Sequence, residues 1–387
     1  MIQLLKYEVA KIIKNRNVIG GMIAAVLMML GVFLVGYYYS QTLSAERHRL
    51  EDGITLDVDQ KIQADYAGTL SDQKVAEIVA DYMNFFQDSK EASEEPVAYI
   101  PFYYDLTATF VAKDRDVWLD MAEAVEQGKR VTIKDIKLNK VADLGVSPFS
   151  EPLRFGNYVP WKDLFAVTSQ LFLVAAVLSI FICSLVFADD VSRNINQLLL
   201  TTKYGRNKMI AAKIIMATLI SLLCFAVIEL INFGVFSWLY DTRGWDTHLQ
   251  MNFNLQLFDF PLALTHGQIY LLLLLIYVFD LLFVIGVSLL ISANMSAPFS
   301  ALAIGLGVFF LPQLLLQLFT SGWPNTMLYL FPINHPYQTL LAMLGYDGQF
   351  ILKENVHNFF LLLAVLLAGK ILTDCGSYYR AKRWQLR

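Results

Sequence analysis

The chain has 387 residues, of which 56% are hydrophobic and only 17% are charged. Soluble domains usually carry about 25% charged residues, so this composition excludes an ordinary soluble protein and indicates a membrane protein. The net charge of −4 gives no basis for a nucleic-acid partner, and the three cysteines lie in or beside apolar runs, which argues against a disulfide framework.

The first residues of the chain have an amphipathic pattern. At helical spacing, five apolar residues share one face and four polar or charged residues share the other: Ile2, Leu5, Val9, Ile12 and Ile13 against Gln3, Glu8, Lys11 and Lys14. We expect an interfacial helix with its lysines toward anionic headgroups, rather than merely the approach to a first span. Membrane lipid is therefore an expected partner.

Six apolar stretches are long enough to cross a bilayer, which requires about 20 mostly apolar residues. They predict an all-α polytopic membrane protein with spans over residues 18–38, 164–187, 210–240, 268–292, 299–319 and 356–373. The first stretch exceeds the hydrophobic region of a typical signal peptide and lacks a good cleavage site, so we expect it to be retained. The predicted domains are residues 1–40, an inserted domain over 41–160, and 161–387.

Lysine and arginine are distributed unevenly between the connections. They cluster before the first span, between the second and third spans, and after the last, whereas segments 241–266 and 320–355 contain only Arg243 and Lys353. Because positive loops stay inside, both termini and the loop over 188–213 should be cytoplasmic in a bacterial-type plasma membrane.

The insertion over residues 41–160 is then extracytoplasmic. Ser71 is a plausible N-cap for a helix whose apolar residues recur at helical spacing, and a second helix is expected over 114–127 with Gly128 following it. This helix-rich domain is either a solvated cap with a small core or a surface that receives or releases a substrate. Its acidity would suit a cationic one.

The loop over residues 188–213 carries the most informative pattern in the chain. Two carboxylates open a short helix, apolar residues follow at its tip, and basic residues lead into the third span: Asp189, Asp190, Arg193, Ile195, Leu198, Leu199, Arg206 and Lys213. Apolar side chains ringed by polar ones suit docking into a groove on a partner protein. An elbow that lies on lipid explains the composition equally well.

This loop resembles the signature of the ABC type-2 permease family, through Asp189 or Asp190, the Leu198-Leu199 pair, Gly205-Arg206 and Lys213. It departs from that signature in having Asp for the usual Glu, no Gly after the acid, and Lys203-Tyr204 for the usual Pro. The six spans and the amphipathic start are also similar to that family.

The resemblance implies that the loop is a coupling helix contacting a separate ATP-binding cassette subunit, which holds ATP and Mg; no cofactor is expected in this chain. It also implies a second permease protomer, in a homodimer or heterodimer. The expected function is the permease subunit of an ATP-driven exporter for a peptide, a lipid-linked molecule or an amphipathic, drug-like substrate.

Polar residues inside the spans mark a candidate substrate path at Glu229, Asn232 and Asp280. A carboxylate in mid-membrane costs about 2.5–3.5 kcal/mol, so each should face protein or water. Hydrogen bonds that fix helix packing are the alternative, and neither acid has an obvious cationic partner in the apolar runs. A kink at Pro312 precedes segment 320–346, where two short re-entrant helices are expected and His335 reads as a turn residue.

Catalytic and metal-binding motifs are absent from the sequence. There is no G-x-x-x-x-G-K-[ST], H-E-x-x-H or G-x-S-x-G pattern, and the five histidines are scattered, so we expect neither an enzyme nor a metal site. The main alternative function is a sensory ABC membrane subunit that acts mechanically on an envelope partner without transport, although such families usually have four spans. A lipid-modifying enzyme would need a catalytic cluster that the sequence lacks.

Overall fold

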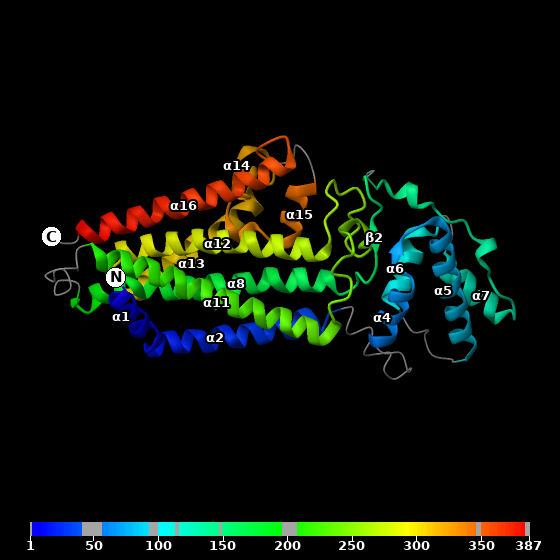
Figure 1. Cartoon of the computed structure of the whole chain (residues 1–387), viewed down its shortest axis with the longest axis horizontal. Helices are drawn as coiled ribbons and strands as arrows, with labels where there is room; N and C mark the ends of the chain where they lie inside the picture. Colours follow the sequence, from blue (N-terminus) through cyan, green and yellow to red (C-terminus); the bar gives the residue numbers. More distant parts are fainter. Residues whose placement is uncertain are drawn as a thin grey trace. The chain divides into compact units, whose positions relative to one another are not determined.

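The structure is a computed structural model that describes residues 2–40, 56–92, 100–112, 116–146, 149–195, 207–345 and 350–383. Helices dominate these residues, and the described strands form one short antiparallel pair (Figure 1). The chain divides into two compact units, each drawn from separate parts of the sequence. The first comprises Met1–Phe33, Ala166–Gly234 and Leu272–Arg387, and the second comprises Leu34–Phe165 and Val235–Leu271.

Six helical segments of the described chain are long and apolar enough to span a membrane. They are Arg16–Tyr38, Trp161–Ser192, Lys208–Tyr240, His266–Asn294, Pro298–Leu318 and Asn355–Arg383. Each contains most or all of one stretch predicted from the sequence, so the prediction of an all-α polytopic membrane protein is confirmed. The extra residues are helical turns at the ends, which hydropathy cannot detect because they are partly polar.

The first unit is a bundle of long helices. It contains α1 (Ile2–Ile13), α2 (Arg16–Phe33), α9 (Ala188–Ser192), α13 (Pro298–Leu318) and α16 (Asn355–Arg383), together with most of α8 (Trp161–Val186), α11 (Lys208–Tyr240) and α12 (His266–Asn294). Between α13 and α16 lie α14 (Gly322–Leu328), the 3-10 turn η5 (Pro332–Asn334) and α15 (Tyr337–Gly345). Short helices thus occur where the sequence predicts the re-entrant segment.

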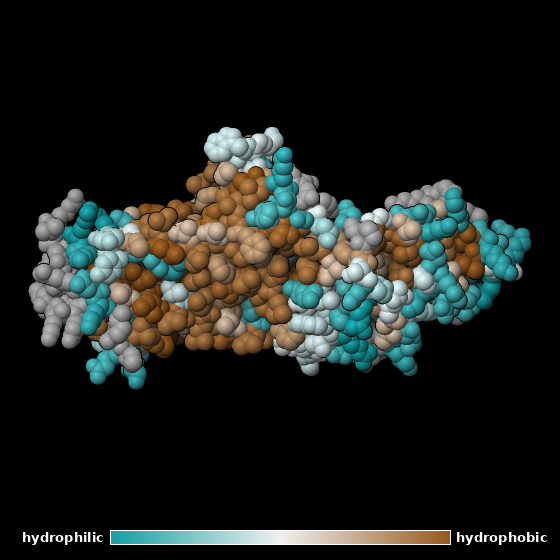
Figure 2. Space-filling view, turned by 45° about the horizontal axis from the view of Figure 1, so that its top comes forward, coloured by the Kyte–Doolittle hydropathy of each residue, from teal (hydrophilic) through white to brown (hydrophobic). Residues whose placement is uncertain are grey.

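Glycines allow the long helices to pack closely. A Cβ on Gly21 of α2 would lie 2.7 Å from the ring of Phe181 on α8, and one on Gly286 of α12 would lie 2.2 Å from Thr373 on α16. Close approach at small residues is the usual way in which membrane helices associate, since lipid supplies no hydrophobic drive between them. The outer surface of the bundle is correspondingly apolar, and hydrophobic residues cover most of its side in Figure 2.

The second unit contains the described part of the insertion. Its elements are the π-helical turn η1 (Leu34–Tyr38), α4 (Leu56–Asp65), α5 (Asp72–Ala92), α6 (Pro101–Phe110), α7 (Val117–Glu126), the 3-10 turns η2 (Ile133–Asp135), η3 (Val141–Leu144) and η4 (Leu249–Met251), and the strands β1 (Gly68–Thr69) and β2 (Arg154–Phe155). The strands pair antiparallel with Gly68 opposite Phe155. The two helices predicted in the insertion are confirmed as α5 and α7.

Local signals explain how these helices begin and end. The Ser71 hydroxyl accepts a hydrogen bond from the Lys74 amide at 3.2 Å, which confirms the predicted N-cap of α5. Asp116 caps α7 by accepting from the amides of Trp118 and Leu119. Gly128 has a φ of +67° just beyond α7, as expected for a residue that ends a helix in the left-handed region.

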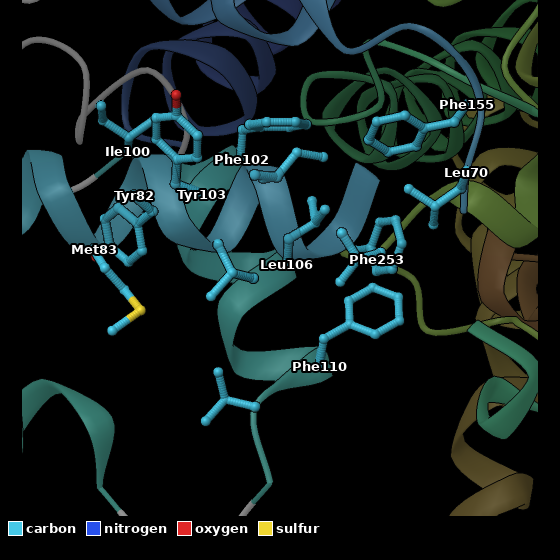
Figure 3. Close-up of a cluster of buried hydrophobic side chains, with 14 of the residues drawn as sticks. Leu70, Tyr82, Met83, Ile100, Phe102, Tyr103, Leu106, Phe110, Phe155 and Phe253 are labelled. Atoms are coloured by element: carbon cyan, nitrogen blue, oxygen red, sulfur yellow. The ribbon is translucent and has the colours of Figure 1, made fainter. Parts of the chain in front are cut away.

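An aromatic core holds this unit together. Phe102 and Phe110 of α6, Tyr82 of α5 and Phe155 of β2 are all buried in one cluster, which Figure 3 shows in close-up. Phe253, from the connection between α11 and α12, enters the same cluster, with its ring centroid 5.7 Å from that of Phe110. The connection therefore supplies part of the core of this unit.

Gly244 illustrates how tightly this connection is held. Its φ is +82°, and a Cβ would lie 1.6 Å from the carbonyl oxygen of Asn157. We expect Gly244→Ala to lower the free energy of unfolding by at least about 2 kcal/mol, because steric overlap and backbone strain add. Thermal unfolding of the purified chain would measure this. Gly31→Ala is the control, since a Cβ at Gly31 would have no atom of another segment within 4 Å, and alanine favours its helix. Equal losses of unfolding free energy for the two variants would contradict the prediction.

Candidate functional site

A cluster of four buried or half-buried charges connects α1, α9 and α11. Lys213 Nζ lies 2.7 Å from Asp190 Oδ2 and 3.1 Å from Glu8 Oε2, and Lys11 forms an ion pair with the other oxygen of Asp190. The side chains of Lys213, Asp190 and Glu8 are each at most 5% exposed. We call these four residues the elbow cluster, because they lie where the chain turns from α8 toward α11.

The elbow cluster has alternating signs and no net charge. A buried charge is costly unless an opposite charge and hydrogen bonds compensate for it, and here each cation contacts at least one carboxylate. Lys213 also donates to the carbonyl of Val186 at 3.3 Å, so its ammonium group contacts the end of α8 as well. The arrangement therefore holds α1, which is far from the other two helices in the sequence, together with α9 and α11 at one point.

The elbow begins at a break between α8 and α9 that α12 stabilises. The amides of Phe187 and Ala188 donate to the hydroxyl of Ser292, both at 3.2 Å, and Ser292 in turn donates to the carbonyl of Ser184 at 3.1 Å. The backbone groups freed by the break are thus satisfied by one side chain, as non-helical backbone in a membrane protein requires.

The predicted coupling residues lie only partly in the described chain. Asp189 and Asp190 are in the first turn of α9, and Asp189 pairs with the exposed Arg193 at 2.9 Å. Ile195 is half-buried. Leu198, Leu199 and Arg206 lie outside the described residues, so their predicted role stays a prediction.

The helix α1 differs in one respect from the sequence-based expectation. Lys11 was expected to face lipid headgroups, but it pairs with Asp190, and Glu8 from the same polar face is buried against Lys213. Ile12 is also buried, whereas Ile13 is 52% exposed. The polar face of one helix cannot reveal a protein partner of opposite charge, which is why amphipathicity alone suggested the headgroups.

Glu229 of the candidate path lies against Asn232 rather than against a cation. The Asn232 side-chain amide donates to Glu229 Oε2 at 3.1 Å and to the hydroxyl of Thr168 on α8 at 3.0 Å. Glu229 is 5% exposed, and its Oε1 has no hydrogen-bond partner among the described residues. This carboxyl group therefore retains one oxygen for another donor.

Asp280 has a partner that the sequence does not identify. Both of its oxygens lie within 3.0 Å of His335 Nδ1, and His335 Nε2 lies 2.7 Å from the carbonyl oxygen of Tyr329. Both side chains are fully buried. The sequence shows no obvious cationic partner for Asp280 within the apolar runs, because His335 lies outside those runs, in a segment where it reads as a turn residue, 55 residues away along the chain.

Further hydrogen bonds extend this pair into a network that we call the re-entrant latch. The Tyr277 hydroxyl donates to the carbonyl of His335 at 3.1 Å and lies 2.7 Å from the hydroxyl of Ser169 on α8. Ser169 also accepts from the amide of Tyr337 at 3.0 Å. Together with Asp280, these residues attach η5 and the start of α15 to α8 and α12.

A third polar contact joins α11 to α16. Lys370 donates to the Thr218 hydroxyl at 3.0 Å and to Asp374 at 2.9 Å. The pair of Lys370 and Asp374 could have been predicted from the sequence, because oppositely charged residues at i,i+4 lie next to each other on a helix. No group of three His, Cys, Asp or Glu side chains suited to a metal ion occurs among the residues that the structure describes.

Comparison with known proteins identifies a family whose match covers nearly the whole chain. A family model described as ABC-2 family transporter protein matches residues 2–374. No curated protein and no solved structure matches the chain. The family match includes the helices of the elbow cluster, the re-entrant latch and the inserted unit.

Proposed function

Since the chain belongs to the ABC-2 family of transporter proteins and is the membrane permease of an ABC transporter, we propose that it exports its cargo by using the ATPase cycle of a separate subunit. That ATP-binding cassette subunit carries ATP and Mg. Two permease protomers, identical or related, form the path across the plasma membrane. Both termini and the elbow face the cytoplasm, and the inserted unit faces outward.

The elbow cluster is the observation that carries this proposal. The ATP-binding subunit docks on Leu198, Leu199 and Arg206, just beyond α9. The docking segment lies between α9 and α11 in the sequence, so a movement of it pulls on both helices. These two helices are also joined by the ion pair of Asp190 with Lys213. Because α1 is joined to the same pair, the ends of several helices shift together when the partner closes on ATP.

The cargo is a peptide, a lipid-linked molecule or another amphipathic compound. Glu229, Asn232 and Asp280 were grouped as a candidate path, but they occupy separate surroundings: Asn232 bridges Glu229 to Thr168, while Asp280 belongs to the re-entrant latch. We retain Glu229 as the member that contacts cargo, because one of its oxygens is unpartnered within the described chain. Asp280 has a positioning role in this proposal.

A mechanical signalling subunit is the less favoured alternative. Such subunits also carry a large outer domain after the first span, but they usually have four spans, whereas the described residues of this chain include six helices suited to crossing a membrane. The polar re-entrant segment between the fifth and sixth spans also suits a transport path, since non-helical backbone at membrane depth normally lines a cavity or lies against protein.

Replacing Leu198 and Leu199 by aspartate tests the docking site. We expect the double variant to lose the ATP-binding subunit that co-purifies with the unaltered chain, because two charges replace the apolar contact. The measurement is the ratio of the two subunits after affinity purification from detergent-solubilised membranes.

Ile351→Asp with Leu352→Asp is the matched control. These are also adjacent apolar residues, 36% and 39% exposed, and they lie before α16 rather than in the elbow. This control should retain the ATP-binding subunit. Retention of that subunit by the Leu198 and Leu199 variant, or its absence from the unaltered preparation, would contradict the proposed coupling.

A further inference from the structure

A cavity of about 370 Å³, partly open to the surface, lies in the first unit between α8, α13 and the re-entrant segment. Its volume is within the range of small-molecule sites, which is about 300–1,000 Å³. The Asp280–His335 pair of the re-entrant latch contributes His335 to the wall. This part of the wall is therefore held by hydrogen bonds between elements.

Three glutamines on membrane-spanning helices line this cavity. Gln170 lies on α8, and Gln313 and Gln317 lie on the same face of α13, one turn apart. All three are exposed, and their side chains make no hydrogen bond within the described part of the chain. An amide without a hydrogen-bond partner is costly in hydrocarbon, so these side chains must face water or a ligand that can hydrogen-bond.

The lining carries no net charge. No Asp, Glu, Lys or Arg is among the described residues around the cavity. The one ionisable pair at its wall is neutral overall: His335 and Asp280 are either an ion pair or two uncharged groups, because they share a single proton between Nδ1 and the carboxylate. A charged ligand would lose its hydration here without gaining a counter-ion.

The same cavity has both polar and apolar surface. Phe172, Leu173 and Leu316 supply hydrocarbon, while each glutamine amide offers both a donor and an acceptor. A hydroxyl group also both donates and accepts, so a head group with several hydroxyls complements three flexible amides. Tyr329 and Thr339 add further hydroxyls to the lining.

We propose that this cavity binds an uncharged glycoside with an apolar tail, with its sugar hydroxyls on Gln170, Gln313 and Gln317. The assignment rests on the proposed function, since it names the class of cargo. It differs from a cationic cargo, which the acidity of the inserted domain would favour, because no carboxylate is among the described residues that line this cavity, and Glu229 of the candidate path lies outside it.

Photolabelling of the full chain in lipid nanodiscs tests the proposal. The probe is octyl glucoside carrying a diazirine on its tail, and the cross-linked residues are mapped by mass spectrometry. We expect labels on α8, α13 or residues 329–339, and we expect competition by unlabelled octyl glucoside but not by octyltrimethylammonium. Labels confined to other regions, or equal competition by the ammonium or by octanoyl-glycinamide, would overturn the assignment.

Gln313→Leu with Gln317→Leu removes two of the amides without adding polarity to the span. Loss of two hydrogen bonds should reduce labelling on the order of tenfold. Gln338→Leu is the control, because Gln338 is exposed on the neighbouring α15 but does not line the cavity. Unchanged labelling in the double variant would refute the role of these amides.

The same preparations separate this inference from the proposed function. Co-purification of the ATP-binding subunit is measured on both glutamine variants and should be unaffected. If that subunit is present and no glycoside is bound, the cargo assignment fails while the permease assignment stands. If glycoside binds and no ATP-binding subunit is found, the proposed coupling fails instead.

Discussion

Lys213→Met should destabilise the protein by about 3–5 kcal/mol, because it leaves Glu8 without its cation and Asp190 with only Lys11. Methionine retains most of the side-chain length, so the loss comes from the missing charge rather than from a cavity. We expect a lower unfolding temperature in nanodiscs and loss of partner-stimulated ATPase activity. Both follow from the separation of α1, α9 and α11.

A double variant makes this prediction specific. Glu8→Leu combined with Lys213→Met removes one carboxylate and one ammonium, which leaves the Lys11–Asp190 pair balanced. We expect the double variant to recover most of the lost stability, since replacing a buried ion pair by apolar groups is often neutral. A double variant no more stable than Lys213→Met alone would show that charge balance is not what holds the elbow.

Arg193→Met is the matched control for losing a cation from the same region. The Arg193 side chain is 59% exposed, and its pair with Asp189 is an i,i+4 contact. Because the Arg193 guanidinium lies largely in water, which screens its pair with the 10% exposed Asp189 side chain, the unfolding temperature should fall less than in Lys213→Met. A fall in unfolding temperature as large as that of Lys213→Met would show that exposed charges, rather than the buried elbow cluster, stabilise this region.

Local features of the fold were predictable from the sequence. Hydropathy located the six candidate spans of the described residues because each requires a long apolar run, and Ser71 and Gly128 marked helix ends because capping depends on nearby residues. The helix α6 was not predicted, and burial of Phe102 and Phe110 stabilises it. Tertiary packing, rather than a helical pattern of apolar residues in the sequence, therefore explains why this segment forms a helix.

The contacts between distant parts of the chain were not predictable in the same way. Lys213 and Asp280 were both singled out as unusual, yet their partners Glu8 and His335 lie 205 and 55 residues away. One sequence shows which buried charges need partners, but it does not show which partner the fold brings to them. Phe253 gives an apolar example, since its place in the core of the inserted unit depends on how the connection after α11 folds.

Asp280→Leu should have the second large effect, because it removes the acceptor of His335 at the centre of the re-entrant latch. His335 can then keep its hydrogen bond to the Tyr329 carbonyl only as a neutral ring, with Nδ1 unpaired in a fully buried site. We expect a loss of about 3–5 kcal/mol in unfolding free energy, as is usual when one partner of a buried pair is removed. Thermal unfolding in nanodiscs measures it.

The graded comparison for this prediction is Tyr277→Phe, which leaves the Asp280–His335 pair intact and removes only the hydroxyl that contacts Ser169 and the His335 carbonyl. Each lost hydrogen bond is worth about 1 kcal/mol, so this variant should be clearly milder. If the latch also holds the cavity wall, Asp280→Leu should reduce glycoside labelling although no glutamine is altered, while the ATP-binding subunit still co-purifies. Equal stability and equal labelling in the two variants would mean that η5 and α15 are held by apolar packing, and that the buried pair has no part in shaping the cavity.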